Sequence, residues 1–595
     1  MKEDQKNILL FALIAAFALF GWPYVANYFF PPANPPATKL EKGKSVAIPA
    51  PGADPAADGP KATRDRAIVL KDSPRVLIET PRLRGSINLK GARIDDLELT
   101  DYDETIKSGS PRIRLLSPEG AAGAYFAEFN WSRADGNAQR AILPADTVWT
   151  ASGTKLTPST PVTLTAVNGG QRYTIELAVD ANYMFTAKQS VANLSGGPVE
   201  ATPFAQVTRA EKSTDLDQWA ANVGPLAIAG GKANYLDYSA LDTAPQTFET
   251  TGGWAGFGDH YWLTAVIPAQ NSPVAITQQH AAGTGYRAVY SLKPKLVQSG
   301  TRMSYTSHFF AGAKEVKVLD EYEAKLGIQK FGFAIDWGWF GIIEQPIFYY
   351  LDFLWKLVGN FGIAIILLTF TIRGLLFPIA QRQFASMANM RAIQPKMKAL
   401  QERYKDDKQK QQQEIMKLYK DEKVNPLAGC LPVLLQIPIM FALYKVLLLT
   451  IEMRHQPFVL WIHDLSAPDP ATILNLFGYL PFTPPSFLAI GVIPVLLGIS
   501  MYFQIKLNPA PMDEMQKQIF SIMPWMLMFV MAPFAVGLQI YWITSNCVTI
   551  AQQSWLYSRH PALKEPIKKD PPKSDPPEPK PTPPKSSKGP RAKAK

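Results

Sequence analysis

The most constraining feature of this chain is an uncharged apolar run near its end, at 518–558. One helical crossing of a bilayer takes about 20 apolar residues, so the run is about twice as long as one crossing needs. The segment 533–537 (PFAVG) interrupts it near the middle, and proline and glycine favour a turn there. The run therefore predicts two short transmembrane helices at 518–557, joined by a tight hairpin.

Four further segments are apolar over about one bilayer thickness. The first is 1–30, whose uncharged run from 8 to 30 is longer than the apolar part of a secretory signal and lacks a small-residue cleavage site. We therefore expect an uncleaved signal anchor there. The others are 357–381, 427–450 and 487–505. With the final pair, these segments predict a polytopic α-helical membrane protein with six transmembrane helices.

The middle of the chain has a different pattern. Residues 31–62 form a linker rich in proline and alanine, a composition that keeps a chain extended. From 63 to 326, short runs such as 172–177 (RYTIEL) and 287–292 (RAVYSL) alternate polar and apolar residues between turn-forming clusters. Alternation with a period of two predicts a large all-β sandwich domain. The amphipathic stretch 313–326 predicts a helix that closes this domain.

The charges of the connecting segments predict the orientation. Residues 331–356 are dense in aromatic residues but interrupted by charges, which is typical of a helix lying in the membrane interface. Segment 382–425 has eleven basic and six acidic residues, whereas 451–486 has one basic and three acidic residues. Because short basic loops stay in the cytoplasm, we expect 382–425, 506–517 and both termini there. The loop 451–486 and the β domain are then periplasmic.

Composition narrows the function further. The 595 residues have a net charge of +11, and the tail 558–595 has eleven basic and four acidic residues interleaved with proline. Such a tail is expected to be disordered and to bind polyanions such as ribosomal RNA or anionic lipid. The two cysteines, Cys430 and Cys547, lie far apart in apolar segments and do not suggest a disulfide scaffold. No phosphate-binding loop or metal-ligand motif is present, so we expect neither an enzyme nor a cofactor.

Polar residues within the spans are the candidates for function. Arg373 lies about eight residues inside the cytoplasmic end of its span, where a charge costs about 2.5–3.5 kcal/mol on insertion scales. It either extends to the inner headgroups or lines a hydrated cavity open to the cytoplasm. The last span has polar or amphipathic residues on one helical stripe, and two other spans add amides at Gln436 and Gln504. These side chains either join helices by hydrogen bonds or line a polar groove.

The loop 382–425 carries a second pattern. Apolar residues recur at intervals of three and four, a spacing typical of helices that pack together: Met390, Ile393, Met397, Leu400 and Tyr404. Another helical run follows the charged stretch 405–408. The loop therefore predicts an antiparallel helical hairpin in the cytoplasm, with a solvated charged spacer as the alternative.

Six short motifs stand out in the helical half of the chain: 369–374 (TFTIRG), 390–396 (MRAIQPK), 423–432 (KVNPLAGCLP), 436–439 (QIPI), 461–466 (WIHDLS) and 537–546 (GLQIYWITSN). They resemble the motifs of the YidC/Oxa/Alb family of membrane-protein insertases. The similarity is close over about 336–557. The order of anchor, linker and large β domain resembles the Gram-negative form of the family more loosely.

The resemblance implies a five-helix core with a hydrophilic groove open to the cytoplasm and to lipid, and a periplasmic β-supersandwich. Family positions for the groove arginine, the groove glutamine and the aromatic pair that meets the substrate match Arg373, Gln436, Tyr541 and Trp542. We expect four further residues to line the same groove: Thr369, Gln504, Gln539 and Asn546.

The predicted function is therefore that of an insertase and folding chaperone, which places newly made proteins in the bacterial inner membrane alone or with the Sec translocon. The implied partners are nascent membrane proteins, SecYEG, SecDF, the lipid bilayer, and the ribosome through the hairpin and tail. Two alternatives remain. A solute transporter or channel would use the same arginine and amides, and a membrane-tethered periplasmic carbohydrate-binding module would act from 63–326.

Overall fold

The structure is a computed structural model, and the residues it describes are 38–41, 44–47, 63–135, 138–215, 222–281, 283–405, 407–422, 431–477, 480, 482, 489–507 and 514–559. The predicted anchor 1–30, most of the linker and the tail after 559 lie outside these residues. The chain divides into two compact units. One comprises Met1–Leu368, Pro438–Gly491 and Ala532–Ile540, and the other comprises Thr369–Ile437, Val492–Met531 and Tyr541–Lys595.

The predicted all-β domain is confirmed, and two large sheets form it within the described residues. The first has 11 strands and contains, in spatial order, β10 (Lys155–Leu156), β3 (Arg75–Glu79), β4 (Leu83–Asn88), β5 (Arg93–Asp103), β7 (Tyr125–Asp135), β15 (Thr202–Arg209), β22 (Gly285–Leu292), β21 (Pro273–Ala281) and β18 (Gln246–Thr251), with β6 (Arg112–Leu116) beside β5 and β8 (Ala138–Ala141) beside β7. Among the strand pairs that the structure describes in this sheet, β10 and β3 run parallel and the others are antiparallel.

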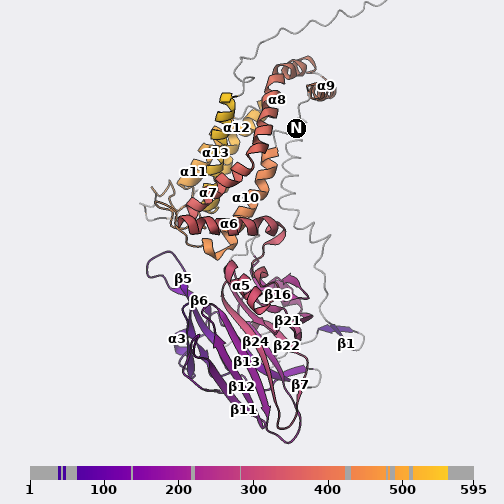
Figure 1. Ribbon diagram of the computed structural model, residues 1–595, viewed down its shortest axis with the longest axis vertical. Helices are drawn as coiled ribbons and strands as arrows, with labels where there is room; N and C mark the ends of the chain where they lie inside the picture. The colour runs from indigo at the N-terminus through magenta and orange to yellow at the C-terminus, as the bar shows by residue number, and fades with distance from the viewer. Residues whose placement is uncertain are drawn as a thin grey trace, which may run out of the picture. The chain divides into compact units, whose positions relative to one another are not determined.

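The second sheet has 9 strands within the described residues. In order they are β17 (Lys232–Tyr235), β16 (Gly224–Ala229), β19 (Trp254–Gly258), β20 (Trp262–Ile267), β24 (Arg302–Ala313), β13 (Met184–Asn193), β12 (Gln171–Val179), β11 (Val162–Asn168) and β9 (Thr150–Ala151). Figure 1 shows β11, β12, β13 and β24 side by side, as their continuous antiparallel registers require. Two short ladders pair β1 (Thr38–Glu41) with β2 (Lys44–Ala47), and β14 (Val199–Glu200) with β23 (Leu296–Val297).

The two large sheets pack face to face around an aromatic core. Trp131 on β7 and Tyr173 on β12 lie on opposite sheets, and their ring centroids are 5.0 Å apart. Buried amides also cross between the sheets: Gln189 donates to the carbonyl oxygen of Asn130 at 2.8 Å, and Gln278 donates to that of Leu226 at 3.0 Å. Because a buried amide without a partner is costly, these bonds fix how the sheets stack.

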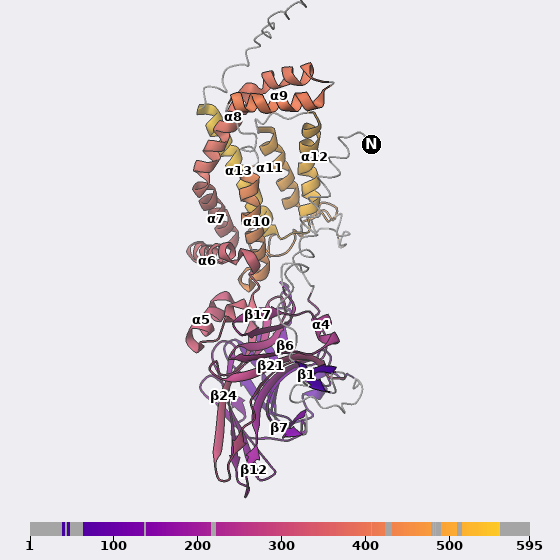
Figure 2. The same cartoon turned by 90° about the vertical axis from the view of Figure 1, so that its right-hand side faces the viewer.

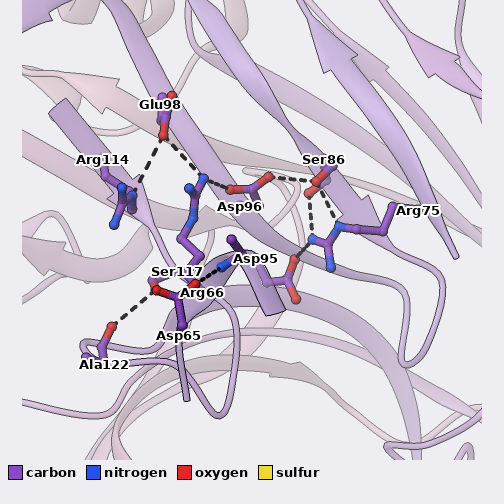
Figure 3. Close-up of polar contacts among 11 residues, drawn as sticks. Asp65, Arg66, Arg75, Ser86, Asp95, Asp96, Glu98, Arg114, Ser117 and Ala122 are labelled. Atoms are coloured by element: carbon purple, nitrogen blue, oxygen red, sulfur yellow. Dashed lines mark hydrogen bonds and ion pairs between the residues drawn. The ribbon is translucent and has the colours of Figure 1, made fainter. Parts of the chain in front are cut away.

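A cluster of polar contacts connects the first elements of the β domain (Figure 3). The short helix α3 (Arg66–Val69) places the Arg66 guanidinium against the buried Asp96 on β5. Asp95, which precedes Asp96 on β5, is also buried and pairs with Arg75 on β3. Arg75 also donates to the Ser86 hydroxyl at 2.8 Å. Burial raises the pKa of Asp95, and the Arg75 guanidinium opposes that shift. Each buried carboxylate thus depends on its own arginine.

The helices of the second half begin after the β domain. Their bounds are α5 (Val316–Leu326), η2 (Phe331–Ala334), η3 (Gly338–Phe340), α6 (Gly341–Val358), α7 (Phe361–Leu375), α8 (Phe377–Arg403), α9 (Lys408–Asp421), α10 (Leu431–Leu449), η5 (Ile451–Met453), α11 (Val492–Leu507), α12 (Glu514–Met531) and α13 (Val536–Arg559), with the short α4 (Tyr238–Thr243) inside the β domain. Across the part of the chain that the structure describes, no helix meets the length and apolar character required to cross a membrane.

The helix boundaries differ from the apolar segments of the sequence. The segment expected at 357–381 covers the last two residues of α6, all of α7 and the start of α8, and α7 and α8 are separated at Leu376. The new helix starts at Phe377, and Pro378, which has no backbone N–H, is tolerated in its first turn. Helix α8 then continues to Arg403, well past the end of the apolar segment.

Candidate functional site

The candidate site is built around Arg373 near the end of α7. Apolar residues dominate α7, and two of its polar side chains, Thr369 and Arg373, are one turn apart on the same face. The guanidinium of Arg373 is half-buried and donates from Nε to the hydroxyl oxygen of Ser545 at 2.8 Å, with a second bond from Nη2. Ser545 is fully buried on α13. Among the described residues, no carboxylate lies within ion-pair distance of this guanidinium, so its neighbour is neutral.

A second polar contact joins α10 to the same helix. Gln436 donates from its side-chain amide to the hydroxyl of Tyr541 at 2.9 Å. Tyr541 is buried and lies four residues before Ser545, so the two hydroxyls occupy one face of α13. Arg373 on α7 and Gln436 on α10 therefore contact the same face of α13, at Ser545 and at Tyr541 one turn earlier.

The third contact comes from α11. Asn546 is buried and donates to the hydroxyl of Ser500 at 2.9 Å, and Ser500 in turn donates to the carbonyl oxygen of Leu497 at 2.8 Å. This arrangement is an interhelical hydrogen bond, one of the two interpretations that the sequence left open for the amides. Gln504 lies one turn after Ser500 on the same face of α11 and is half-buried.

The remaining predicted residues have different surroundings. Thr369 is fully buried on α7, and Trp542 is half-buried beside Tyr541. Gln539 belongs to the other compact unit, where its amide donates to the carbonyl oxygen of Phe534 at 2.9 Å, at the start of its own helix. Gln539 therefore supports the beginning of α13.

Sequence reasoning missed Ser545 and Ser500, the hydroxyls that Arg373 and Asn546 contact. One signal was present, because Ser545 follows Tyr541 by four residues and so must share its face. The sequence does not show which other helix packs against the face of α13 that carries Tyr541 and Ser545.

The basic segment after α7 forms a helical pair, visible in Figure 2 as α8 and α9 lying side by side. Lys396 on α8 forms an ion pair with Glu422 at 2.6 Å, and the Tyr419 hydroxyl donates to the sulfur of Met397 at 3.3 Å. Ile393 is buried against Tyr419. The contacts pair the end of α9 with the middle of α8, as an antiparallel arrangement requires.

A separate buried ion pair links α6 to α10. Glu344 on α6 is fully buried, and its Oε2 lies 3.6 Å from Nζ of Lys445 on α10. The Lys445 ammonium also donates to the carbonyl oxygen of Asp336 at 2.9 Å. Burial raises the pKa of Glu344 to about 7, even though the Lys445 charge opposes that shift. Among the described residues, no group of three or more His, Cys, Asp or Glu side chains could hold a metal ion.

Family models match both the β domain and the helical part of the chain. The family model described as 60Kd inner membrane protein matches residues 353–564, and that of the YidC periplasmic domain matches residues 75–350. A membrane protein insertase YidC from Zymomonas mobilis is 45% identical over 572 residues, which cover 95% of this chain and 97% of the relative. One from Methylobacterium radiotolerans is 42% identical over 596 residues, covering 94% and 96%. A crystal structure of an active YidC insertase with its first transmembrane domain resolved aligns at a TM-score of 0.36 and 16% identity, covering 83% of this chain and 94% of that one.

The matches define the class of this protein: an inner-membrane protein that joins a helical membrane domain to a periplasmic β-sandwich. The chain belongs to the YidC family of membrane protein insertases. The family resemblance and the insertase activity expected from the sequence are thereby confirmed.

Proposed function

We propose that this chain inserts newly made proteins into the inner membrane through a polar groove beside α13, open to the cytoplasm and to lipid, and assists their folding. The observation that supports this proposal most directly is the neutral contact of Arg373. A half-buried guanidinium held by one hydroxyl has no compensating negative charge among the described residues. It therefore attracts an acidic group that enters the groove.

The proposed mechanism begins with a hydrophobic helix that carries a short acidic tail. The tail enters the groove toward Arg373, while the apolar segment passes Tyr541 and Trp542 into lipid. A tail that travels through a polar groove crosses less hydrocarbon, which lowers the desolvation cost. Burial of the apolar segment then drives the step, and a membrane potential contributes up to about 2.3 kcal/mol for each full charge moved across 100 mV.

The proposed topology has six transmembrane helices, of which five form the conserved core. The apolar segments at 357–381, 427–450, 487–505 and 518–557 support it, together with the run at 8–30. The excess of basic residues in 382–425 supports a cytoplasmic location for that hairpin and for both termini. The β domain and the loop 451–486 are then periplasmic.

The proposed partners follow from the same surfaces. Nascent membrane proteins are the substrates. The charged hairpin of α8 and α9 and the basic tail 558–595 are the candidates for contact with the ribosome, because both carry an excess of positive charge. SecYEG and SecDF are further proposed partners, which would allow insertion alone or together with the translocon.

The groove proposal is tested with single-span substrates whose tails carry either no acidic residues or several, inserted into vesicles that contain the purified protein. Protection of the tail from protease measures insertion. Arg373→Ala should impair only the acidic-tailed substrates, and Arg373→Lys should largely retain them because the charge remains. Lys506→Ala is the matched control, since Lys506 is an exposed cation at the end of α11 whose loss should leave both substrates unaffected. Equal activity of Arg373→Ala and Arg373→Lys on acidic tails would refute the proposed role.

A further inference from the structure

Part of the loop that joins α10 to α11 exposes a group of large apolar side chains. Ile473 and Leu474 are 48% and 50% exposed, and Leu476 and Phe477 are 55% and 56% exposed. We call 472–477 the apolar loop. Four large apolar side chains within five positions are unusual on a surface that faces water.

The base of the apolar loop is firmly held. Thr472 forms an antiparallel bridge with Gly491, and the backbone N–H of Ile473 donates to the carbonyl oxygen of Ile490 at 3.2 Å. The buried carboxylate of Asp469 accepts bonds from the Trp461 indole and from the backbone just before Thr472, both at 2.9 Å. The exposure of the apolar side chains is therefore a property of an anchored loop.

Several backbone N–H groups in and just after this loop donate hydrogen bonds within the segment. The N–H of Leu476 donates to the carbonyl oxygen of Ile473 at 3.1 Å, and that of Phe477 donates to Thr472 at 2.9 Å. Farther along, the N–H of Leu480 donates to the carbonyl oxygen of Asn475 at 3.0 Å. A segment can enter an apolar medium only when its backbone groups are paired internally, because each unpaired group costs several kcal/mol there.

The backbone conformation of this turn is strained at two residues. Leu476 and Phe477 have φ values of 50° and 62°, in the left-handed region that side chains other than glycine rarely adopt. This conformation projects two large apolar side chains outward. An apolar environment around those side chains stabilises the arrangement, whereas exposure to water adds to its cost.

We propose that the apolar loop dips into the outer leaflet of the bilayer in which the protein resides, at the boundary between headgroups and acyl chains. The inference rests on the proposed topology, in which the loop 451–486 is periplasmic. Lipid is the occupant that fits, because no charged residue occurs from 470 to 505, a stretch that includes the apolar loop and nearly all of the apolar helix α11. A surface that binds a protein partner usually has a rim of polar residues around its apolar centre, and the stretch from 470 to 505 supplies no charged residue for such a rim.

The test places a fluorescent probe on the loop. In a background of Cys430→Ser and Cys547→Ser, Phe477→Cys is labelled with a polarity-sensitive dye and reconstituted in phosphatidylethanolamine–phosphatidylglycerol vesicles. Quenchers are nitroxides attached to the lipid acyl chain near the headgroup, or iodide in the water. Val167→Cys is the matched control, because Val167 is an apolar residue of the β domain that is 67% exposed.

The label at Phe477→Cys should be quenched severalfold more by the lipid nitroxide than the label at Val167→Cys, and severalfold less by iodide. Leu474→Cys supplies a second position if the first substitution disturbs the loop. Strong iodide quenching without lipid quenching overturns the proposal. So does protection from both quenchers, which would indicate a protein contact such as a second copy. Insertion activity measured on the same vesicles separates this result from the groove proposal, since loss of activity with intact lipid quenching leaves the loop assignment standing.

Discussion

The buried pair of Glu344 and Lys445 leads to a prediction whose size follows from the structure. Glu344 is fully buried, and among the described residues neither of its carboxylate oxygens has a hydrogen-bond partner. Its pKa rises from 4.5 to about 7 because burial disfavours the ionised form more than the Lys445 charge favours it. Since one pKa unit corresponds to about 1.36 kcal/mol, the native state loses about 3 kcal/mol when Glu344 ionises.

The sign of the effect follows from the raised pKa. In the unfolded chain Glu344 releases its proton near pH 4.5, and in the folded protein near pH 7. Its contribution to the free energy of unfolding is therefore fully present below pH 4.5 and disappears as the pH rises through 7. The substitution Glu344→Gln keeps the side chain neutral at every pH and should remove this dependence.

Hydrogen exchange of the α6 amides measures the effect. At pH 8, α6 in the unsubstituted protein should exchange roughly 100-fold faster than in Glu344→Gln, which is the equivalent of about 3 kcal/mol. At pH 4.5 the two proteins should exchange alike. Glu321→Gln is the control, because Glu321 lies on the exposed surface of α5 and should alter α6 at neither pH. Slower exchange in the unsubstituted protein at pH 8 would mean that attraction to Lys445 outweighs burial, and the reasoning would be wrong.

Two further predictions concern the β domain. Gly312→Ala should lower the unfolding temperature by an amount equivalent to about 1–3 kcal/mol or more, because the added Cβ would lie 2.2 Å from the Tyr183 ring. Gly196→Ala is the control, because no atom lies within 4 Å of its added Cβ, and it should leave the unfolding temperature unchanged. Equal effects of the two substitutions would contradict the packing argument. Arg75→Ala should cost about 3–5 kcal/mol in urea unfolding, because it leaves the buried Asp95 carboxylate without its cation, and Arg75→Ala combined with Asp95→Asn should recover part of that loss.

The β domain could be predicted from the sequence because its pattern is local. In β12, the predicted alternation of 172–177 corresponds to side chains that are buried and less buried in turn. In β22 the same kind of pattern is present in the sequence, yet every residue from Gly285 to Leu292 is buried. This strand has neighbours on both sides and is covered on both faces, so polar residues such as Arg287 and Ser291 lie inside. Alternation thus identifies a strand but does not place it within a sheet.

The site was only partly accessible from the sequence, for a related reason. Helical spacing identifies residues that share a face, as with Tyr541 and Ser545, but the partners of that face are distant in sequence. Arg373 contacts a residue 172 positions away. Likewise, the sequence shows that charged residues interrupt the aromatic stretch 331–356, but it does not show that Glu344 is buried against a lysine about 100 positions later. Hydropathy indicates whether a segment lies in an apolar environment, but it does not show where one helix ends and the next begins, so it does not locate the break between α7 and α8 at Leu376.

The neutral partner of Arg373 bears on how long a client remains bound. In the proposed mechanism, a client carboxylate takes over the two contacts that the Arg373 guanidinium makes with the Ser545 hydroxyl, and the net preference is the difference between the old and the new hydrogen bonds, on the order of 1 kcal/mol. A preference of that size is less than tenfold in equilibrium. Under the groove proposal, Ser545 would then be displaced by a client and rebind Arg373 at little cost, which would favour short residence times and let one copy of the protein handle many clients in succession.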